Sequence, residues 1–251
     1  MAMIDYSWVV LFAVLGLVFG SFGTVLICRV PLHKNIGGRS HCPQCRHVLS
    51  PIELVPLMSY ILQCGRCRHC HRTINALYPG IELSSALLFT LALFLDRSPL
   101  PALLLALALW LLLLIAVIDM HTRTIHDVLN FSFVFLAVAY AIAIGEFQAI
   151  GALLLGGFFG LQWLLSRGRW VGSGDILLGV GIGFLLGSMA PALLCLGLSY
   201  VLGAIVASYL LVTRKATSKS AVPFGPFLAM STLLTVVFGD RIIAVLILGL
   251  F

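Results

Sequence analysis

Long apolar stretches, separated by short loops, occupy most of this 251-residue sequence. A run of about 17 to 25 apolar residues is long enough to cross the hydrocarbon core of a bilayer as a helix. With 61% hydrophobic and 10% charged residues, the chain is also too apolar for a soluble domain, in which roughly 45 to 50% of residues are apolar. The sequence therefore predicts an all-α polytopic membrane protein.

About eight membrane-spanning helices are predicted. The candidate spans are residues 8–28, 78–95, 99–118, 128–145, 149–165, 175–188, 191–213 and 223–238. The stretch 175–188 is short for a full crossing, which favours a helix packed inside a bundle around a polar site. The tail 242–251 is too short to cross alone, so it either extends the last span or lies at the membrane interface.

The basic residues predict the orientation of the chain. If the N-terminus lies outside, 13 of the 15 Lys and Arg residues fall in cytoplasmic loops, and only Arg97 and Arg241 fall outside. The positive-inside rule selects this topology. The first apolar run has no basic segment before it, so we expect a retained span and no cleaved signal peptide. The net charge of +6 thus reports membrane orientation, and we expect no nucleic-acid partner.

The polar segment 29–77 lies in the cytoplasm in this topology and contains two Cys-x-x-Cys pairs, Cys42 with Cys45 and Cys67 with Cys70. Two such pairs at this spacing are typical of a zinc ribbon, in which four thiolates surround one ion. Structural disulfides are disfavoured in a reducing cytoplasm, while a redox dithiol and a pairing of Cys64 with Cys67 stay open as alternatives. The nearby His41, His47, His69 and His71 could substitute as ligands or be solvated loop residues.

Two acidic residues lie at the edges of apolar runs. Asp119 directly follows the third predicted span and Asp175 begins the sixth, so the topology places both carboxylates at the cytoplasmic face. Two carboxylates in a partly dry site share one proton, which is the condition for an aspartic protease. Gly172 and Gly174 would allow a tight turn and close approach of an extended substrate.

Other functions of these acids stay open on the residues alone. Asp175 could cap its helix, and Asp119 could be an interfacial acid paired with Arg123 or His121. A proton-coupled transporter also places carboxylates inside membranes, although the sequence has no evident internal repeat of the kind common in transporters. A catalytically silent membrane scaffold, with the cysteine loop as a docking module, is a further alternative.

An ordered set of motifs resembles one known family. The stretches "GSFGTVLICRVP", "CPQC", "ELVPLMSYIL", "GRCRHC", "YPGIELSSALLF", "AVIDMHTRTIHDVLN", "GSGD" and "PFGPFLA" closely resemble the bacterial type IV prepilin peptidases, or leader peptidases/N-methyltransferases. The likeness runs from about residue 16 to 230. It implies a GxGD-type aspartic protease of the bacterial inner membrane that cleaves the basic leader of prepilins or pseudopilins after a glycine, on the cytoplasmic side.

The resemblance also implies roles for particular residues. Asp119 and Asp175 would be the catalytic pair, and Cys42, Cys45, Cys67 and Cys70 would bind the metal. Many family members also methylate the new N-terminal residue with S-adenosylmethionine. Glu53 resembles a family position linked to methyl transfer, with a solvated loop residue as the alternative. Glu82 could contact the substrate or methyl donor, or pair with Arg72.

The chain departs from the family pattern near both aspartates. Leu177 stands where the family usually has Lys, and His126 stands where it usually has Pro before Asp127. We expect Asp127 to be the N-cap of the fourth helix, with a substrate contact as the alternative. The predicted organisation is a first helix at 1–28, a zinc-binding loop at 29–77 and a membrane protease domain at 78–251, in contact with lipid and with a prepilin.

Overall fold

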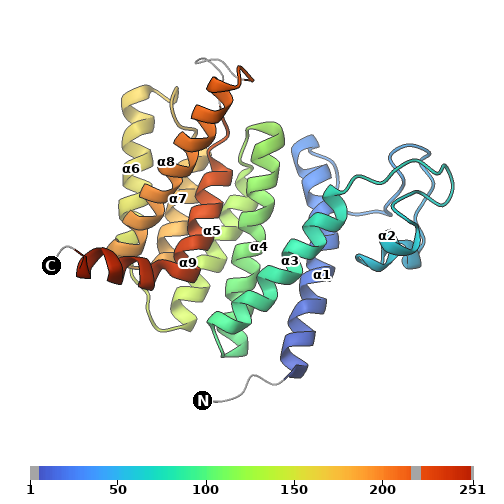
Figure 1. The fold of residues 1–251 in the computed structure, drawn as a ribbon, viewed down its shortest axis with the longest axis horizontal. Helices are drawn as coiled ribbons and strands as arrows, with labels where there is room; N and C mark the ends of the chain where they lie inside the picture. The colour runs from blue at the N-terminus through green and yellow to red at the C-terminus, as the bar shows by residue number, and fades with distance from the viewer. Residues whose placement is uncertain (1–5, 216–221, 250–251) are drawn as a thin grey trace. The chain divides into compact units, whose positions relative to one another are not determined.

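The structure of this protein is a computed structural model that describes residues 6–215 and 222–249. Within these ranges the regular secondary structure is helical. The only β pairing there consists of two isolated bridges, both among residues 33–76. The all-α prediction is confirmed. The helices shown in Figure 1 are α1 (Tyr6–Arg29), α2 (Met58–Leu62), α3 (Leu77–Leu95), α4 (Pro99–Thr122), α5 (Asp127–Ala143), α6 (Ile150–Ser166), α7 (Ser173–Leu186), α8 (Met189–Val212) and α9 (Gly225–Leu248), with two short 3-10 helices, η1 (Val30–Leu32) and η2 (Pro51–Leu54).

Eight of these helices correspond to the predicted spans. Five of them, α1, α3, α4, α8 and α9, are long and apolar enough to cross a membrane. The other three are apolar but shorter, with 17 residues in α5 and α6 and 14 in α7. At about 1.5 Å per residue, α7 is shorter than the roughly 30 Å hydrocarbon core. The structure therefore establishes a multi-pass membrane protein, while the count of about eight spans stays a prediction.

The chain forms two compact units, Met1–Trp110 and Leu111–Phe251. In the first unit, α1 packs directly on α3 through glycine. A Cβ atom on Gly16 would lie 2.6 Å from the Cα atom of Ala86, and one on Gly20 would lie 2.6 Å from the Cα atom of Glu82. Small residues let two membrane helices approach to backbone contact, which is how helices associate where the hydrophobic effect is absent. Residues 33–76, the cysteine loop, connect these two helices.

In the second unit, the short helix α7 packs against α5 and α6. Its contact with α6 is again made by glycine, since Gly183 touches the backbone of Ala152 and a Cβ atom on Gly179 would lie 2.7 Å from the ring of Phe159. Leu178 and Ile182 on α7 are fully buried. This agrees with the expectation that the short stretch 175–188 would form a helix packed against others inside the bundle.

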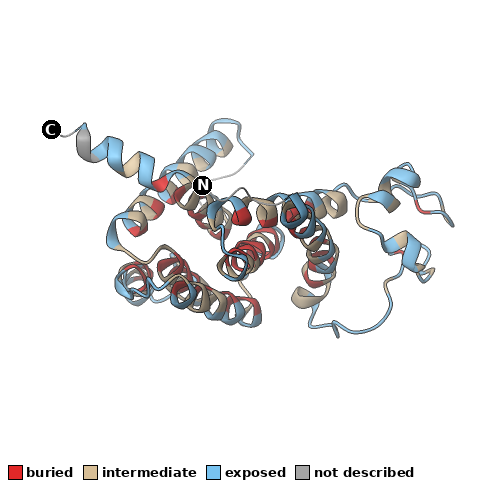
Figure 2. Ribbon diagram, turned by 90° about the horizontal axis from the view of Figure 1, so that it is seen from below, coloured by how far each residue is buried: buried red, intermediate tan, exposed pale blue. Residues whose placement is uncertain are grey.

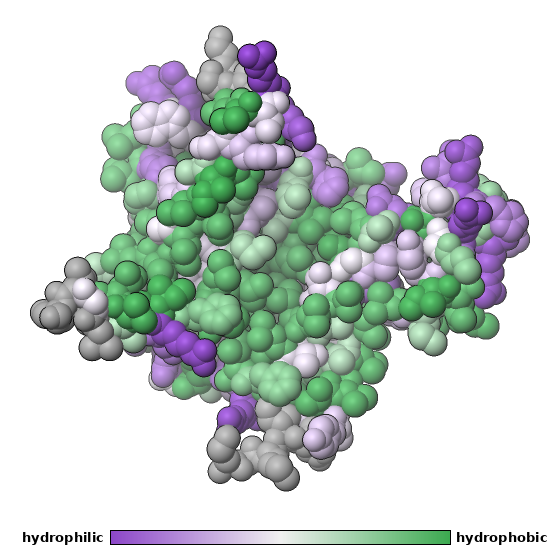
Figure 3. Space-filling view, in the orientation of Figure 1, coloured by the Kyte–Doolittle hydropathy of each residue, from purple (hydrophilic) through white to green (hydrophobic). Residues whose placement is uncertain are grey.

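The outer surface of the helices is apolar. Large side chains such as Phe135 and Leu153 are 71% and 72% exposed, and Figure 3 shows apolar side chains over much of the helical surface. Figure 2 shows buried residues on the inward faces of the helices and a mostly exposed cysteine loop. An apolar exterior on the helices is expected where the solvent is lipid.

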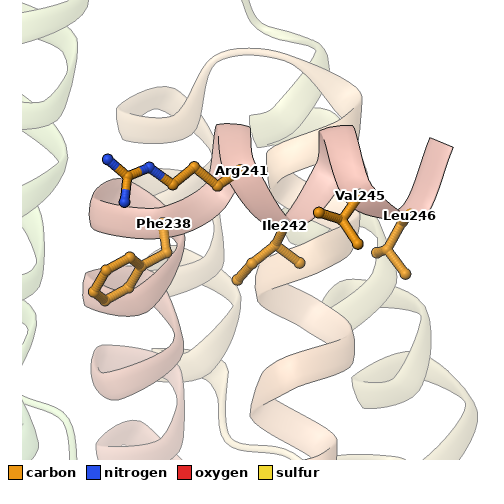
Figure 4. Close-up of a pocket in the computed structure, with 5 residues that line it drawn as sticks. All are labelled: Phe238, Arg241, Ile242, Val245 and Leu246. Carbon is orange, nitrogen blue, oxygen red and sulfur yellow. The ribbon is translucent and has the colours of Figure 1, made fainter. Parts of the chain in front are cut away.

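The last helix, α9, continues beyond the predicted end of its span. It is helical to Leu248, but it turns sharply between Phe238 and Arg241 (Figures 1 and 4). The segment predicted either to extend the span or to lie at the interface is thus a bent helical extension. A shallow apolar groove along it is lined by Phe238, Arg241, Ile242, Val245 and Leu246 (Figure 4). This groove is at the opposite end of α9 from Gly225, where the polar site begins.

Candidate active site and metal centre

Asp119 lies in the last turn of α4 and is 5% exposed. The helix ends just after it because Arg123 adopts a left-handed backbone conformation (φ 56°). One carboxylate oxygen, Oδ2, accepts a hydrogen bond of 2.9 Å from the backbone N–H of Gly225 at the start of α9. This bond gives a buried acid a specific partner, and the ring of His121 instead lies 2.7 Å from the carbonyl of Val117.

Asp175 is the third residue of α7 and is half-buried. Its Oδ2 atom accepts a hydrogen bond of 3.1 Å from the backbone N–H of Gly172. A carboxylate at this position stabilises the start of a helix by binding a free N–H and by its favourable interaction with the helix dipole. The N-cap of α7 is Gly172, so Asp175 stabilises the helix start from its third position and not as the N-cap considered from the sequence. Its second carboxylate oxygen is left for other chemistry.

The glycine at 174 is required by close packing. A Cβ atom there would lie 2.8 Å from the Cβ atom of Ile125, in the linker between α4 and α5. The carbonyl of Gly174 accepts a hydrogen bond of 2.8 Å from the side chain of Asn130 on α5. The turn that carries Asp175 is thus held against the segment that follows Asp119.

The structure places Asp119 and Asp175 near the same interhelical contact, because Ile125 and Asn130, which follow Asp119, both pack on Gly174. The two aspartates come from helices that are distant in sequence, and both lie in the second compact unit. Such a pair can share one proton between two carboxylates. That the two carboxylates share a proton, and the catalytic role of each, stays a prediction.

Gly225 belongs to this site and was not singled out from the sequence as a functional residue. Its N–H binds Asp119, and a Cβ atom on it would lie 2.7 Å from Oδ2 of that carboxylate. The motif "PFGPFLA" was the available signal. Nothing in the local pattern, however, indicated which acid the glycine would meet.

If Asp119 has the catalytic role expected from the sequence, replacing Gly225 with alanine should reduce the expected cleavage activity by roughly 10- to 100-fold, because a displacement of about 1 Å at a catalytic group has an effect of this order. The added methyl group would force the Asp119 carboxylate away from its N–H partner. Gly197→Ala on α8 is a matched control, since a Cβ atom at that glycine meets no atom within 4 Å. The measurement is the rate of leader removal in isolated membranes, and equal rates for both variants would contradict the assignment.

The four predicted metal ligands converge at the cysteine loop. The sulfur atoms of Cys42, Cys45, Cys67 and Cys70 all lie within 4.8 Å of one another, and those of Cys42 and Cys70 are 3.9 Å apart. Four thiolates around zinc at about 2.3 Å would be separated by roughly 3.8 Å. The donor set can therefore bind one tetrahedral ion, and Cys64, which is exposed, is not in the cluster.

The two Cys-x-x-Cys pairs lie in turns, the cysteine knuckles, that have the same backbone geometry. Cys42 N–H donates to His47 O, and Cys67 N–H donates to Arg72 O, each at 2.9 Å. In both, the residue after the second cysteine is left-handed, with φ 59° at Arg46 and 53° at His71. This repeated turn points each pair of sulfurs toward the other pair, as a shared ion requires.

Comparison with known proteins identifies the family. The model of the bacterial peptidase A24 N-terminal domain matches residues 14–95, and that of the type IV leader peptidase family matches residues 105–208. A Bacillus subtilis protein named prepilin leader peptidase/N-methyltransferase is 35% identical over 240 residues, which cover 92% of this chain and 94% of the relative. The chain belongs to the type IV leader peptidase family. It is accordingly an enzyme of the peptidase class.

Further relatives of this family support the assignment. Proteins of the same name from Pseudomonas putida and Pseudomonas aeruginosa are each 30% identical, covering 97% and 96% of this chain and 95% and 96% of the relatives. The likeness therefore extends over nearly the whole length. No solved structure matches the chain.

Glu53 and Glu82 both bind the segment between the cysteine knuckles. Oε2 of Glu53 accepts hydrogen bonds of 2.9 Å from the backbone N–H and the hydroxyl of Ser50. These bonds hold the pKa of Glu53 below its usual value, and the bond from the backbone N–H of Ser50 has the larger effect. Oε2 of Glu82, on α3, accepts a hydrogen bond of 2.8 Å from Leu57 N–H. Glu82 thus anchors this loop to α3. Neither alternative considered from the sequence, a contact with the substrate or methyl donor or a pairing with Arg72, anticipated this bond.

The positions that depart from the family pattern are arranged as follows. The N-cap of α5 is His126, so the prediction that Asp127 is the N-cap is wrong by one position. Asp127 is instead the exposed first residue of the helix. At this position its negative charge interacts favourably with the helix dipole. Leu177 is half-buried on α7, two residues after Asp175.

Proposed function

We propose that this protein is a membrane aspartic endopeptidase that removes the basic leader of type IV prepilins or pseudopilins at the cytoplasmic face of the inner membrane. The observation that supports this proposal is the packing of the segment after Asp119 against the turn that carries Asp175, in a chain whose relatives are named prepilin leader peptidases. Such substrates serve type IV pili and type II secretion.

The proposed chemistry uses one proton shared by the two carboxylates. The ionised aspartate takes a proton from a water molecule, which attacks the carbonyl carbon of the scissile peptide bond. The protonated aspartate donates its proton to the carbonyl oxygen, which gives a tetrahedral intermediate. When this intermediate collapses, the C–N bond breaks, the first aspartate gives the proton it took from water to the leaving amine, and the second takes back the hydroxyl proton. The backbone N–H groups of Gly225 and Gly172 hold the two carboxylates in place, so that neither has to reorganise during the reaction.

The proposed topology puts the N-terminus outside and the two aspartates at the inner face. The loops between α1 and α3, α4 and α5, α6 and α7, and α8 and α9 would then be cytoplasmic. Together with Arg29 at the end of α1, they contain every Lys and Arg except Arg97 and Arg241. Lys219 is one of these loop residues and lies outside the described ranges. The dyad would thus lie level with the junction between a basic leader and an apolar pilin helix.

We place the substrate helix laterally against the bundle. The mature end of a prepilin begins an apolar helix, which can enter from lipid, while the peptide next to it must unwind locally to reach the carboxylates. In this arrangement residues 78–251 carry the peptidase chemistry, residues 1–28 form the first membrane helix, and residues 29–77 form the metal-binding loop.

Coexpression with a prepilin tests the proposed function. Wild-type protein is expected to convert the precursor to a shorter form that migrates faster on a gel, and mass spectrometry should place the cleavage after a glycine. A scaffold would leave the precursor intact. A transporter would show substrate flux that aspartate substitutions abolish, with no change in pilin mobility.

The proposed metal is zinc, held by Cys42, Cys45, Cys67 and Cys70. Zinc bound by four thiolates is a structural ion, because it has no open coordination position for substrate. The loop has few buried apolar side chains, since Cys42 and Cys67 are its only buried hydrophobic residues. The metal would therefore supply much of the free energy that folds residues 33–76.

The proposed second activity is methylation of the new N-terminal residue with S-adenosylmethionine, with Glu53 and Glu82 as cofactor-binding residues. Both carboxylates are tied to residues 50–57, so both could present negative charge beside this loop to the cationic methyl donor. When bound, the cofactor supplies the methyl group. The chain's own part is to hold it beside the newly exposed amine.

Glu82→Gln and Glu53→Gln separate the charge of each residue from its anchoring role. A glutamine oxygen can still accept from Leu57 N–H or Ser50 N–H, so the loop should keep its position. We expect cleavage to persist and methylation of the mature N-terminus to fall at least tenfold, as measured by mass spectrometry of processed pilin. Undiminished methylation in both variants would contradict the cofactor role.

A further inference from the structure

Asn130 is a fully buried polar residue on α5, with 0% of its surface exposed. Its Nδ2 atom donates a hydrogen bond of 2.8 Å to the carbonyl oxygen of Gly174, the residue directly before Asp175. The opposite orientation of the carboxamide would set two carbonyl oxygens against each other, so Gly174 fixes which atom is the nitrogen. The bond joins α5 to the turn that carries one of the two aspartates.

The second polar atom of this side chain has no protein partner. Within the described parts of the chain, Oδ1 of Asn130 is buried and accepts no hydrogen bond. An unsatisfied buried acceptor costs about 1 to 3 kcal/mol, and a leucine of similar size would avoid that cost. Because both atoms belong to one carboxamide, the unmatched oxygen lies beside the peptide that carries Asp175.

Asn130 acts together with a second contact on the same turn. Ile125 packs so closely on Gly174 that a Cβ atom there would lie 2.8 Å away. Ile125 and Asn130 both follow Asp119 along the chain, in the linker and first turns of α5. One short segment therefore connects the end of α4, where Asp119 lies, to the turn where Asp175 begins α7.

We propose that Asn130 is a positioning residue of the peptidase site. Its amide nitrogen holds the Gly174 carbonyl and so sets the place of Asp175 relative to Asp119, and its unmatched oxygen accepts a hydrogen bond from a water bound beside the pair. Asn130 itself performs no proton transfer. This inference rests on the proposed peptidase function and adds a residue that acts on the dyad through the backbone.

Asn130→Leu and Asn130→Asp test the assignment. Leucine keeps the volume but removes both polar atoms, and aspartate keeps the shape but replaces the donor to Gly174 with an oxygen. We expect kcat for leader cleavage to fall roughly 10- to 100-fold with little change in KM, because the substrate is still bound but the carboxylates are misplaced. The melting temperature of the leucine variant should stay close to that of the wild type, because leucine fills the same volume and α7 keeps its packing against α5 and α6.

Ser132→Ala is the matched control. Ser132 lies on the same helix, is exposed, and only binds the carbonyl of its own helix at Val128, so its loss should change neither kcat nor melting temperature. The proposal holds if at least one Asn130 variant loses kcat while keeping its melting temperature. It is overturned if both variants cleave like the wild type, or if activity and melting temperature fall together in both. An inactive wild type would overturn the peptidase function, and this inference with it.

Discussion

Asp119→Asn and Asp175→Asn are each expected to abolish leader cleavage, with a fall in kcat/KM of roughly 10⁴-fold or more, the scale seen when one member of a catalytic unit is removed. Asparagine has nearly the same shape as aspartate and can still accept the N–H of Gly225 or Gly172 through its carbonyl oxygen. It cannot take a proton from water or give one to a peptide carbonyl. The measurement is the amount of mature pilin formed on coexpression.

The double variant gives a sharper signature. If the two carboxylates act as one unit that shares a proton, removing the second should cost almost nothing after the first. Asp240→Asn is the control, because Asp240 is an exposed acid near the far end of α9 and should leave cleavage unchanged. Membrane levels of every variant should equal those of the wild type. Normal processing by both single variants would rule out the assigned chemistry.

Cys42→Ser and Cys67→Ser should each release the bound zinc and unfold the cysteine loop. Structural zinc contributes about 10 to 16 kcal/mol to the folding of small metal-binding domains, and these two cysteines are the loop's only buried hydrophobic residues. We expect less than one-tenth of the wild-type zinc by elemental analysis of purified protein. Limited proteolysis should also cut residues 33–76 in the variants under conditions that spare the wild type.

Cys64→Ser provides the internal comparison for this experiment. Cys64 lies three residues before Cys67, yet it is exposed and outside the sulfur cluster. Its substitution should leave zinc content and protease resistance unchanged. Full zinc in both knuckle variants, or loss of zinc in the Cys64 variant alone, would show that the ligand set is different.

Properties that depend on neighbours in sequence could be predicted from the sequence. Hydrophobic runs predicted the helices, and the bounds of α3 and α6 differ from the predicted ones by a single residue at each end or less. The spacing of the two Cys-x-x-Cys pairs predicted the four-sulfur cluster, because each knuckle is a local turn. Asp127 shows the limit of such patterns, since the helix begins one residue earlier than its capping role required.

Only the tertiary structure decided which atoms surround the aspartates. Hydropathy predicted the depth of Asp119 and Asp175 in the membrane. It could not predict that the N–H of Gly225 binds Asp119 or that Asn130 holds the peptide before Asp175. It likewise gave no sign that Glu82 anchors Leu57. The physical reason is that helix formation and membrane insertion depend on local composition, whereas each of these hydrogen bonds joins backbone and side chain from segments far apart in sequence. Their geometry exists only after the helices have packed.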